Sequence, residues 1–135
     1  MKIVINDCYG GFGLSRKAEV EYLKLKGKEA FIYTSTYGGP YDRVEPDCDC
    51  LTTYTFTKDL GDTFKKWPKN DGGYFYGRDI ERTDKDLVAV VEMLGEEANG
   101  SCAELKVIEI PDDIDWGLSE YDGIETIEEK HRSWG

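Results

Sequence analysis

A glycine-rich bend near the N-terminus is the part of this sequence best suited to bind an anion. Gly10, Gly11 and Gly13 follow a short apolar segment, and Ser15 and Arg16 come directly after them. If this glycine bend (residues 9–13) joins a strand to a helix, its backbone N–H groups and the helix dipole favour a phosphate or carboxylate. The bend lacks the third small residue of a dinucleotide fingerprint and the Lys-Ser/Thr of a P-loop. The alternative is a tight turn in which the glycines serve geometry alone.

Two arginines in the second half of the chain are further candidates for ligand binding. Arg78 and Arg82 flank Asp79 and follow the aromatic run Tyr-Phe-Tyr at residues 74–76. Guanidinium groups beside aromatic faces suit a nucleobase that carries phosphate. The alternative is a solvated turn in which an arginine pairs with Asp79. If this segment and the glycine bend contact one ligand, a nucleotide-like anion fits both.

The cysteines and the single histidine give little support for a metal site or for catalysis. The cysteines stand at positions 8, 48, 50 and 102, and the histidine stands at position 131. Structural zinc sites draw on paired Cys-x2-4-Cys knuckles, which this spacing does not supply. A Cys–His nucleophile pair would need residues far apart in the sequence to meet. We therefore expect no metal, no cofactor, no catalytic residue and no enzyme activity, and we expect four free thiols in a reducing compartment.

The negative charge is concentrated near the C-terminus. The formal net charge is -11, and residues 109–129 include nine acidic residues and no lysine or arginine. This segment is either a solvated surface whose aromatic residues pack on the domain, or a face that docks on a basic host protein. The candidate docking residues are Glu120, Tyr121, Asp122 and Glu125. The overall charge argues against direct binding of nucleic acid.

The elements that must position these residues predict an α+β fold. With 135 residues, the chain has the length of one domain, so we expect a single domain over residues 1–135 with the acidic segment 109–135 packed on it. We expect a mixed β-sheet of about four to six strands with two main helices packed on one face.

The first half of the chain has the pattern of a strand, a helix and a second strand. Residues 2–6 and 30–34 are apolar and β-branched, which predicts buried strands. The helix between them is expected at 15–27, capped by Ser15. Because such units pair their strands in parallel, a right-handed crossover is expected. Residues 37–50 are expected to form a loop.

The second half of the chain contains the clearest helical pattern. Apolar residues recur at helical spacing in 83–99, and Thr83 is the expected cap. Strands are expected at 51–57 and 103–110, and a short helix at 124–132.

Length and apolar patterning also exclude membrane spans. The longest apolar runs are far shorter than the ~20 residues that a spanning helix needs. The first residues turn polar too soon for a signal peptide. We therefore expect a cytoplasmic protein that does not bind membranes, and the oligomeric state remains open.

Three stretches resemble a known family. They are IVINDCYGGFGLS at residues 3–15, the segment 78–100 beginning RDIERTD, and the segment 103–134, which begins AELKVIEIPDD and ends HRSW. They resemble a widespread family of small uncharacterised proteins of phages, prophages and bacterial chromosomes. The resemblance covers both ends of the chain and excludes the middle, about residues 36–73. It implies a phage or mobile-element setting in a bacterial host cytoplasm, with a role against host defence, and it assigns no catalytic residues.

These observations predict a non-enzymatic phage-type accessory protein that binds a small anionic, nucleotide-like ligand. The expected ligand-binding residues are Gly10, Gly11, Gly13, Ser15, Arg16, Arg78 and Arg82. The alternative function is an acidic protein-binding module that docks on a basic host protein.

Overall fold

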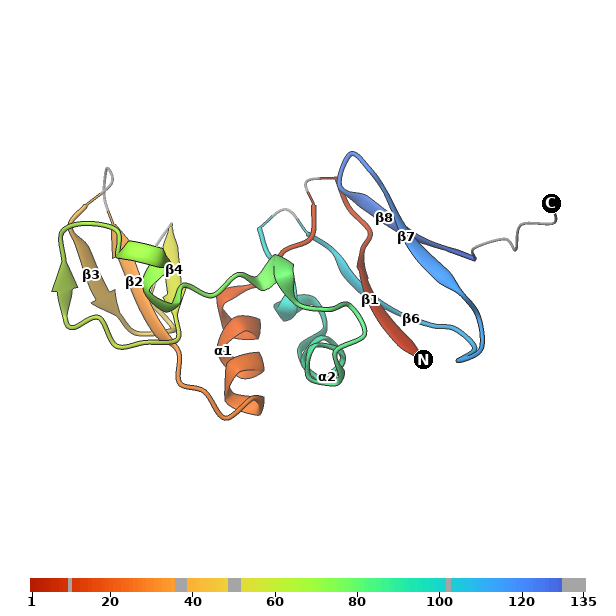
Figure 1. Ribbon diagram of the computed structural model, residues 1–135, viewed down its shortest axis with the longest axis horizontal. Helices are drawn as coiled ribbons and strands as arrows, with labels where there is room; N and C mark the ends of the chain where they lie inside the picture. Colours follow the sequence, from red (N-terminus) through yellow and green to blue (C-terminus); the bar gives the residue numbers. More distant parts are fainter. Residues whose placement is uncertain (10, 36–38, 49–51, 102, 130–135) are drawn as a thin grey trace.

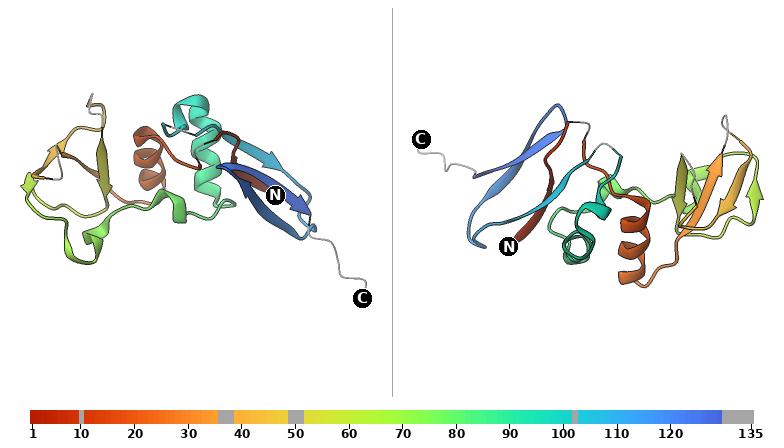
Figure 2. Two further views of the ribbon diagram at one scale, coloured as in Figure 1. Left: turned by 90° about the horizontal axis from the view of Figure 1, so that it is seen from above. Right: turned by 180° about the vertical axis from the view of Figure 1, so that it is seen from behind.

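The computed structural model describes residues 1–9, 11–35, 39–48, 52–101 and 103–129. Within these residues the chain forms two α-helices, three short 3₁₀ helices and eight strands in three antiparallel sheets. The expected α+β class is therefore confirmed. Figure 1 shows an elongated molecule with a four-stranded sheet at one end, the helices in the middle and two two-stranded sheets at the other end. The views in Figure 2 show the same order.

A two-stranded sheet packs on a helix next to the centre of the molecule. β1 (Lys2–Asn6) pairs with β6 (Leu105–Glu109), and α2 (Lys85–Leu94) contacts both strands. Figure 1 shows β1 between α2 and the C-terminal hairpin. The apolar run of β1 is therefore fully enclosed, and Ile3 and Val4 have no exposed surface.

The helix α1 (Arg16–Leu25) begins where the sequence predicts. Ser15 is its N-cap, and the Ser15 hydroxyl oxygen accepts a hydrogen bond from the backbone N–H of Ala18 at 3.1 Å. This bond satisfies one of the backbone donors that a helix start leaves unpaired. The helix buries Ala18, Tyr22 and Leu23.

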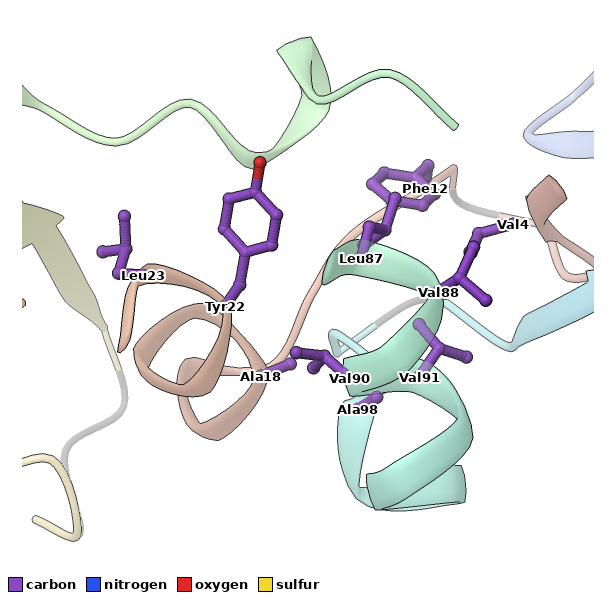
Figure 3. Packing of buried hydrophobic residues seen from close by; sticks show 10 residues of the cluster. All are labelled: Val4, Phe12, Ala18, Tyr22, Leu23, Leu87, Val88, Val90, Val91 and Ala98. Atoms are coloured by element: carbon purple, nitrogen blue, oxygen red, sulfur yellow. The ribbon is translucent and has the colours of Figure 1, made fainter. Parts of the chain in front are cut away.

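One hydrophobic cluster joins both helices, β1 and the glycine bend, as Figure 3 shows. Its buried members are Val4, Phe12, Ala18, Tyr22, Leu23, Leu87, Val88, Val90, Val91 and Ala98. Phe12 lies in this core, so the glycine bend is anchored to the helices.

The second helix begins one residue later than expected, and its cap is different. Asp84, rather than Thr83, is the N-cap, and one Asp84 carboxylate oxygen accepts from the N–H of Asp86 at 2.8 Å. A carboxylate oxygen is as strong a cap as a hydroxyl, so either neighbouring residue fits the sequence pattern. The helix α2 ends at Leu94, and the 3₁₀ helix η3 (Gly95–Ala98) completes the expected helical span.

The middle of the chain forms an aromatic-rich sheet of its own. β2 (Phe31–Ser35) lies between β3 (Tyr41–Val44) and β4 (Thr53–Phe56), and β5 (Thr63–Phe64) pairs with β3. The expectation of a loop throughout 37–50 is wrong because β3 lies within it. The rings of this second cluster are buried or half-buried: Phe31, Tyr33, Tyr41, Tyr54, Phe56, Phe64, Trp67 and Tyr74.

The acidic segment forms a hairpin. β7 (Trp116–Tyr121) pairs with β8 (Ile124–Glu129), and Asp122 and Gly123 form the turn with φ angles of 55° and 92°. The helix expected at 124–132 is therefore wrong over its described part, residues 124–129. Two positive φ angles match the backbone of a two-residue hairpin turn, for which Asp-Gly is a preferred pair.

The sheet topology also differs from the expectation. The strands in residues 2–6 and 30–34 do not pair in parallel, because β1 pairs with β6 and β2 belongs to the four-stranded sheet. The single mixed sheet is replaced by three antiparallel sheets. The partner of β1 lies far away in the sequence, so the local pattern of residues does not identify it.

Two further expectations concern membranes and cysteines. In the part of the chain that the structure describes, no helix is long and apolar enough to cross a membrane.

Cys8 is a free thiol, whereas Cys48 is disulfide-bonded, so the expectation of free thiols is wrong at Cys48. Cys50 and Cys102 lie outside the described residues.

Candidate functional site

A cavity of about 370 Å³ lies where three separate segments meet. Gly11 and Phe12 line it from the glycine bend, and Arg78 and Arg82 line it from the segment before α2. The turn of the β7–β8 hairpin closes the third side, at residues 120–125. The glycine bend, the segment with Arg78 and Arg82 and part of the acidic segment therefore form one site, which we call the first cavity.

Arg82 is committed to an ion pair at the base of the first cavity. Its guanidinium donates to both carboxylate oxygens of Glu125, and the Nη2···Oε2 distance is 2.9 Å. The guanidinium also stacks on the ring of Phe12, with its central carbon 3.7 Å from the ring centroid. The two paired side chains expose only 15% and 6% of their surface. Since Glu125 neutralises it, Arg82 adds little attraction for an anion.

Asn6 holds the hairpin against β1. Its side-chain amide donates to the backbone oxygen of Gly123 at 2.6 Å, and its backbone N–H donates to Glu125 at 2.9 Å. The Asn6 side chain also accepts from the N–H of Glu104 at 2.8 Å, and Asn6 has no exposed surface. A buried polar group satisfied in this way fixes its neighbours in one arrangement. The wall formed by the hairpin turn is therefore preorganised.

Arg78 is the available cation of the site. It is exposed, and it forms no hydrogen bond or ion pair with any residue that the structure describes. A Cβ added to Gly11 would lie 4.0 Å from Arg78 Nη2, so the guanidinium lies beside the bare backbone of the glycine bend. Gly11 has a φ of 94°, which side chains rarely adopt. The backbone of Gly11 and an unpaired guanidinium thus lie close together.

A second cavity of about 230 Å³ lies on the other side of Arg78. It lies between the start of α1 and the segment 74–78, and Arg78 lines both cavities. Its walls are largely aromatic or apolar, and Glu19 contributes a carboxylate. The lining residues are Gly13, Leu14, Glu19, Tyr74, Phe75, Tyr76, Gly77 and Arg78.

Glu19 is the unusual titratable group of the second cavity. Burial raises its pKa to about 7, although a hydrogen bond from Thr55 and the nearby Arg16 both oppose the rise. Thr55 Oγ1 donates to Glu19 Oε1 at 3.2 Å. Glu19 therefore needs further donors to be fully stable as a carboxylate near neutral pH.

A short network holds the aromatic wall of the second cavity in place. The Tyr76 hydroxyl donates to Asp71, and the indole N–H of Trp67 donates to the other Asp71 oxygen at 2.9 Å. These two bonds lower the pKa of Asp71. Tyr74 and Tyr76 meet edge to face with their ring centroids 4.8 Å apart. Tyr76 is 47% exposed, but its hydrogen bond to Asp71 and its contact with Tyr74 hold its ring in position.

The remaining predicted ligand residues lie elsewhere. Gly10 lies outside the described residues. Gly13 lines the second cavity, and Ser15 serves as the helix cap while its hydroxyl donates to the backbone oxygen of Glu97. Arg16 lines neither cavity, and its guanidinium donates to the backbone oxygen of Cys48 at 2.6 Å. Of the predicted residues, the structure thus brings Gly11, Arg78 and Arg82 together.

The predicted docking residues separate into two groups. Glu120, Tyr121 and Asp122 are exposed at the hairpin turn, and Tyr121 exposes 80% of its surface. Glu125 is buried and paired with Arg82. Glu120 and Asp122 of the exposed group line the first cavity, so the two predicted sites share a border.

Glu19 is a residue of the site that the sequence pattern does not indicate. Nothing local distinguishes it from the other acidic residues on helices, because its environment comes from β4 and from the segment 74–78.

Among the residues that the structure describes, no group of three or more histidine, cysteine, aspartate or glutamate side chains could hold a metal ion. Comparisons of the chain with protein-family models, with curated proteins and with solved structures find no match.

Proposed function

We propose that this chain is a non-enzymatic binding protein that holds a small, anionic, nucleotide-like ligand at Arg78. The observation that supports the proposal is the unpaired Arg78 guanidinium, which lines both cavities and lies beside the glycine bend. A guanidinium with free N–H groups is well suited to recognise a phosphate through two parallel hydrogen bonds. Arginine supplies neither a nucleophile nor a proton acceptor, so the proposed role is binding without turnover.

The charges around the first cavity limit the ligand. The carboxylates of Glu120, Asp122 and Glu125 line it together with two guanidinium groups, of which one is already paired. A triphosphate would meet repulsion from the exposed carboxylates at the rim. A ligand with one phosphate, or a phosphodiester with one charge per phosphate, matches the single available guanidinium better.

The setting of this activity is proposed from the resemblance to phage and prophage proteins. In a bacterial host cytoplasm, a protein that retains a signalling nucleotide without degrading it would lower the free concentration of that signal. Such sequestration is a form of counter-defence that needs no catalytic residue.

The test is the affinity for the four ribonucleoside 5′-monophosphates, measured by equilibrium dialysis with the full chain. Arg78→Ala removes the free guanidinium and should weaken binding about 10-fold or more, the loss of a charge-assisted hydrogen bond. Arg43→Ala is the matched control, because it removes one positive charge from β3, where Arg43 forms an exposed pair with Asp59. Equal affinity of wild type and Arg78→Ala for every nucleotide would refute the proposal.

The exposed rim of the hairpin turn supports a second candidate, an acidic module that docks on a basic host protein. Tyr121 is 80% exposed between two acidic side chains, and exposed aromatic residues are enriched in interfaces. Capture of a basic protein from host extract should then weaken with salt. It should also weaken in the double variant Glu120→Gln, Asp122→Asn. Capture that ignores both changes would exclude this face.

A further inference from the structure

The two cavities that share Arg78 are each small. Their volumes are about 370 and 230 Å³, so the first lies near the lower end of the ~300–1,000 Å³ range of small-molecule pockets and the second lies below it. A ligand of nucleotide size that is held at Arg78 can therefore extend into both cavities, because Arg78 lines each of them. With the phosphate at Arg78 beside the glycine bend, the remaining part of the ligand extends into the second cavity.

The walls of the second cavity match a flat, aromatic group. Tyr74 and Tyr76 supply rings, Leu14 and Phe75 supply further apolar surface, and Gly77 leaves the backbone bare. Bases stack favourably on aromatic side chains because every base has a flat π-face. The hydrogen bond from Tyr76 to Asp71 holds one of these rings in place before a ligand arrives.

The polar group of this cavity is the Glu19 carboxylate. Its Oε1 accepts from Thr55, and its Oε2 lies 3.9 Å from the position that a Cβ on Gly77 would occupy. A carboxylate has about four lone-pair sites, so both oxygens can accept further hydrogen bonds. Burial raises the Glu19 pKa to about 7, so N–H donors from a ligand would stabilise the ionised form that burial disfavours.

From this geometry we infer that the second cavity selects a guanine base, whose adjacent N1–H and N2–H groups donate to the Glu19 carboxylate while its phosphate is held by Arg78. The inference rests on the proposed function above, because it assigns the base of the same nucleotide-like ligand. It goes further by naming the base and the residue that recognises it.

Guanine fits because an ionised carboxylate accepts at both oxygens. The guanine edge presents two neighbouring N–H donors, which match these acceptors. Adenine and cytosine each present one donor next to one acceptor, and uracil presents one donor between two acceptors. For these bases an acceptor of the ligand would face a carboxylate oxygen, which is repulsive and leaves a buried group unsatisfied.

Arg78 also argues against a simple cation as the ligand. A carboxylate among aromatic rings is a typical site for an ammonium group. Here the unpaired guanidinium of Arg78 lines the same small cavity and would repel such a group. A neutral base with N–H donors satisfies Glu19 without this repulsion.

The test compares guanosine, inosine and adenosine 5′-monophosphates as probes, with affinities from equilibrium dialysis of the full chain. Inosine monophosphate lacks the N2 amino group and is otherwise the same molecule. We expect guanosine monophosphate to bind about 10-fold more tightly than either analogue, the discrimination typical of a two-bond contact with a base edge. Equal affinities for the three probes in the wild-type protein would overturn the inference.

Two variants separate this inference from the proposed function. Glu19→Gln keeps the size of the side chain and can accept from Thr55, but it replaces one acceptor by a donor, so the preference for guanine should disappear. Gly77→Ala should fold, because its Cβ would make ordinary contacts of 3.7–3.9 Å, yet it narrows the cavity and should weaken guanosine monophosphate about 5-fold.

The outcomes differ clearly between the two ideas. If Arg78→Ala weakens all three probes equally and Glu19→Gln retains the guanine preference, the inference is overturned and the proposed function stands. If no probe depends on Arg78, both are overturned. If Glu19→Gln removes the preference while Arg78→Ala weakens every probe, both are supported.

Discussion

The guanidinium of Arg82 and the carboxylate of Glu125 form a buried, two-bond ion pair across 43 residues of sequence. This pair ties the segment before α2 to the C-terminal hairpin, and Phe12 of the glycine bend stacks against the guanidinium. It therefore fixes the relative positions of all three walls of the first cavity. Residues that the sequence suggested for two different functions thus stabilise one another.

The Arg82–Glu125 pair predicts a large loss of stability when one partner is changed. Glu125→Gln leaves a buried guanidinium without its counter-charge, which typically costs about 3–5 kcal/mol. Urea denaturation should show this loss in the free energy of unfolding. The control is Glu97→Gln, which removes an exposed pair with Lys17 and should change stability by less than about 1 kcal/mol. Similar losses in both variants would contradict a special role for the buried pair.

Glu19 predicts a specific dependence of stability on pH. Its pKa is raised from 4.5 to about 7 by burial, so between these values the folded chain keeps a proton that the unfolded chain loses. The stabilising effect is therefore complete below the unfolded pKa and is lost as the pH rises through the folded pKa. The expected loss from this one group is about 2–3 kcal/mol.

Glu19→Gln isolates this contribution from that of the other acidic residues. The variant should be about as stable as wild type near pH 5 and about 2–3 kcal/mol more stable near pH 8. Arg16, Thr55 and Tyr74 interact with the carboxylate, Arg78 lines the same cavity, and all four are unchanged in this comparison. The measurement is urea denaturation of both proteins across this pH range, and parallel curves would show that the Glu19 pKa is not raised.

The N-cap of α2 is Asp84 and not its neighbour Thr83, so substitutions at these two positions should differ in their effect on stability. Its carboxylate caps the helix, accepts from the Tyr22 hydroxyl at 2.9 Å and pairs with Lys26 at 3.1 Å. Burial alone would raise the Asp84 pKa, but the hydrogen bonds from Lys26, the helix start and Tyr22 lower it. Asp84→Ala should therefore reduce the free energy of unfolding by about 1–2 kcal/mol. Thr83→Ala, at the cap position that the sequence suggests, should leave the unfolding midpoint nearly unchanged.

The sequence predicted α1 and α2 well because the signals of these two helices are local. Ser15 caps α1 as expected, and the apolar stripe of α2 is buried at Leu87, Val90 and Val91. Both features depend on residues within four positions of one another. Strand pairing failed because a strand can satisfy its backbone with any partner, and the partner of β1 lies about one hundred residues away at β6.

The hairpin was missed although its signal is present. Asp122-Gly123 between β-forming residues is a strong signal for a two-residue turn, but the many glutamates of this segment favoured a helix. The site could be predicted only in part for the same reason as the sheets. Arg78 follows from its aromatic neighbours, whereas Glu19 becomes distinctive only when β4 and the segment 74–78 bury it.

The contact between Gly13 and Gly100 gives the last prediction, because these two backbones touch. A Cβ on Gly100 would lie 2.8 Å from the carbonyl carbon of Gly13, which is closer than real side chains come. The Gly100 N–H also donates to the Gly13 oxygen at 2.9 Å, so the backbones cannot separate without losing this bond.

Gly100→Ala should therefore destabilise the chain by about 1–3 kcal/mol and shift the glycine bend. Gly13→Ala is the matched control, because its nearest contact would be an ordinary 3.9 Å. Urea denaturation measures both, and dialysis with guanosine 5′-monophosphate should show weaker binding for Gly100→Ala under conditions where it remains folded. If Gly13→Ala lowered the free energy of unfolding more than Gly100→Ala, that result would contradict the close approach of these two backbones.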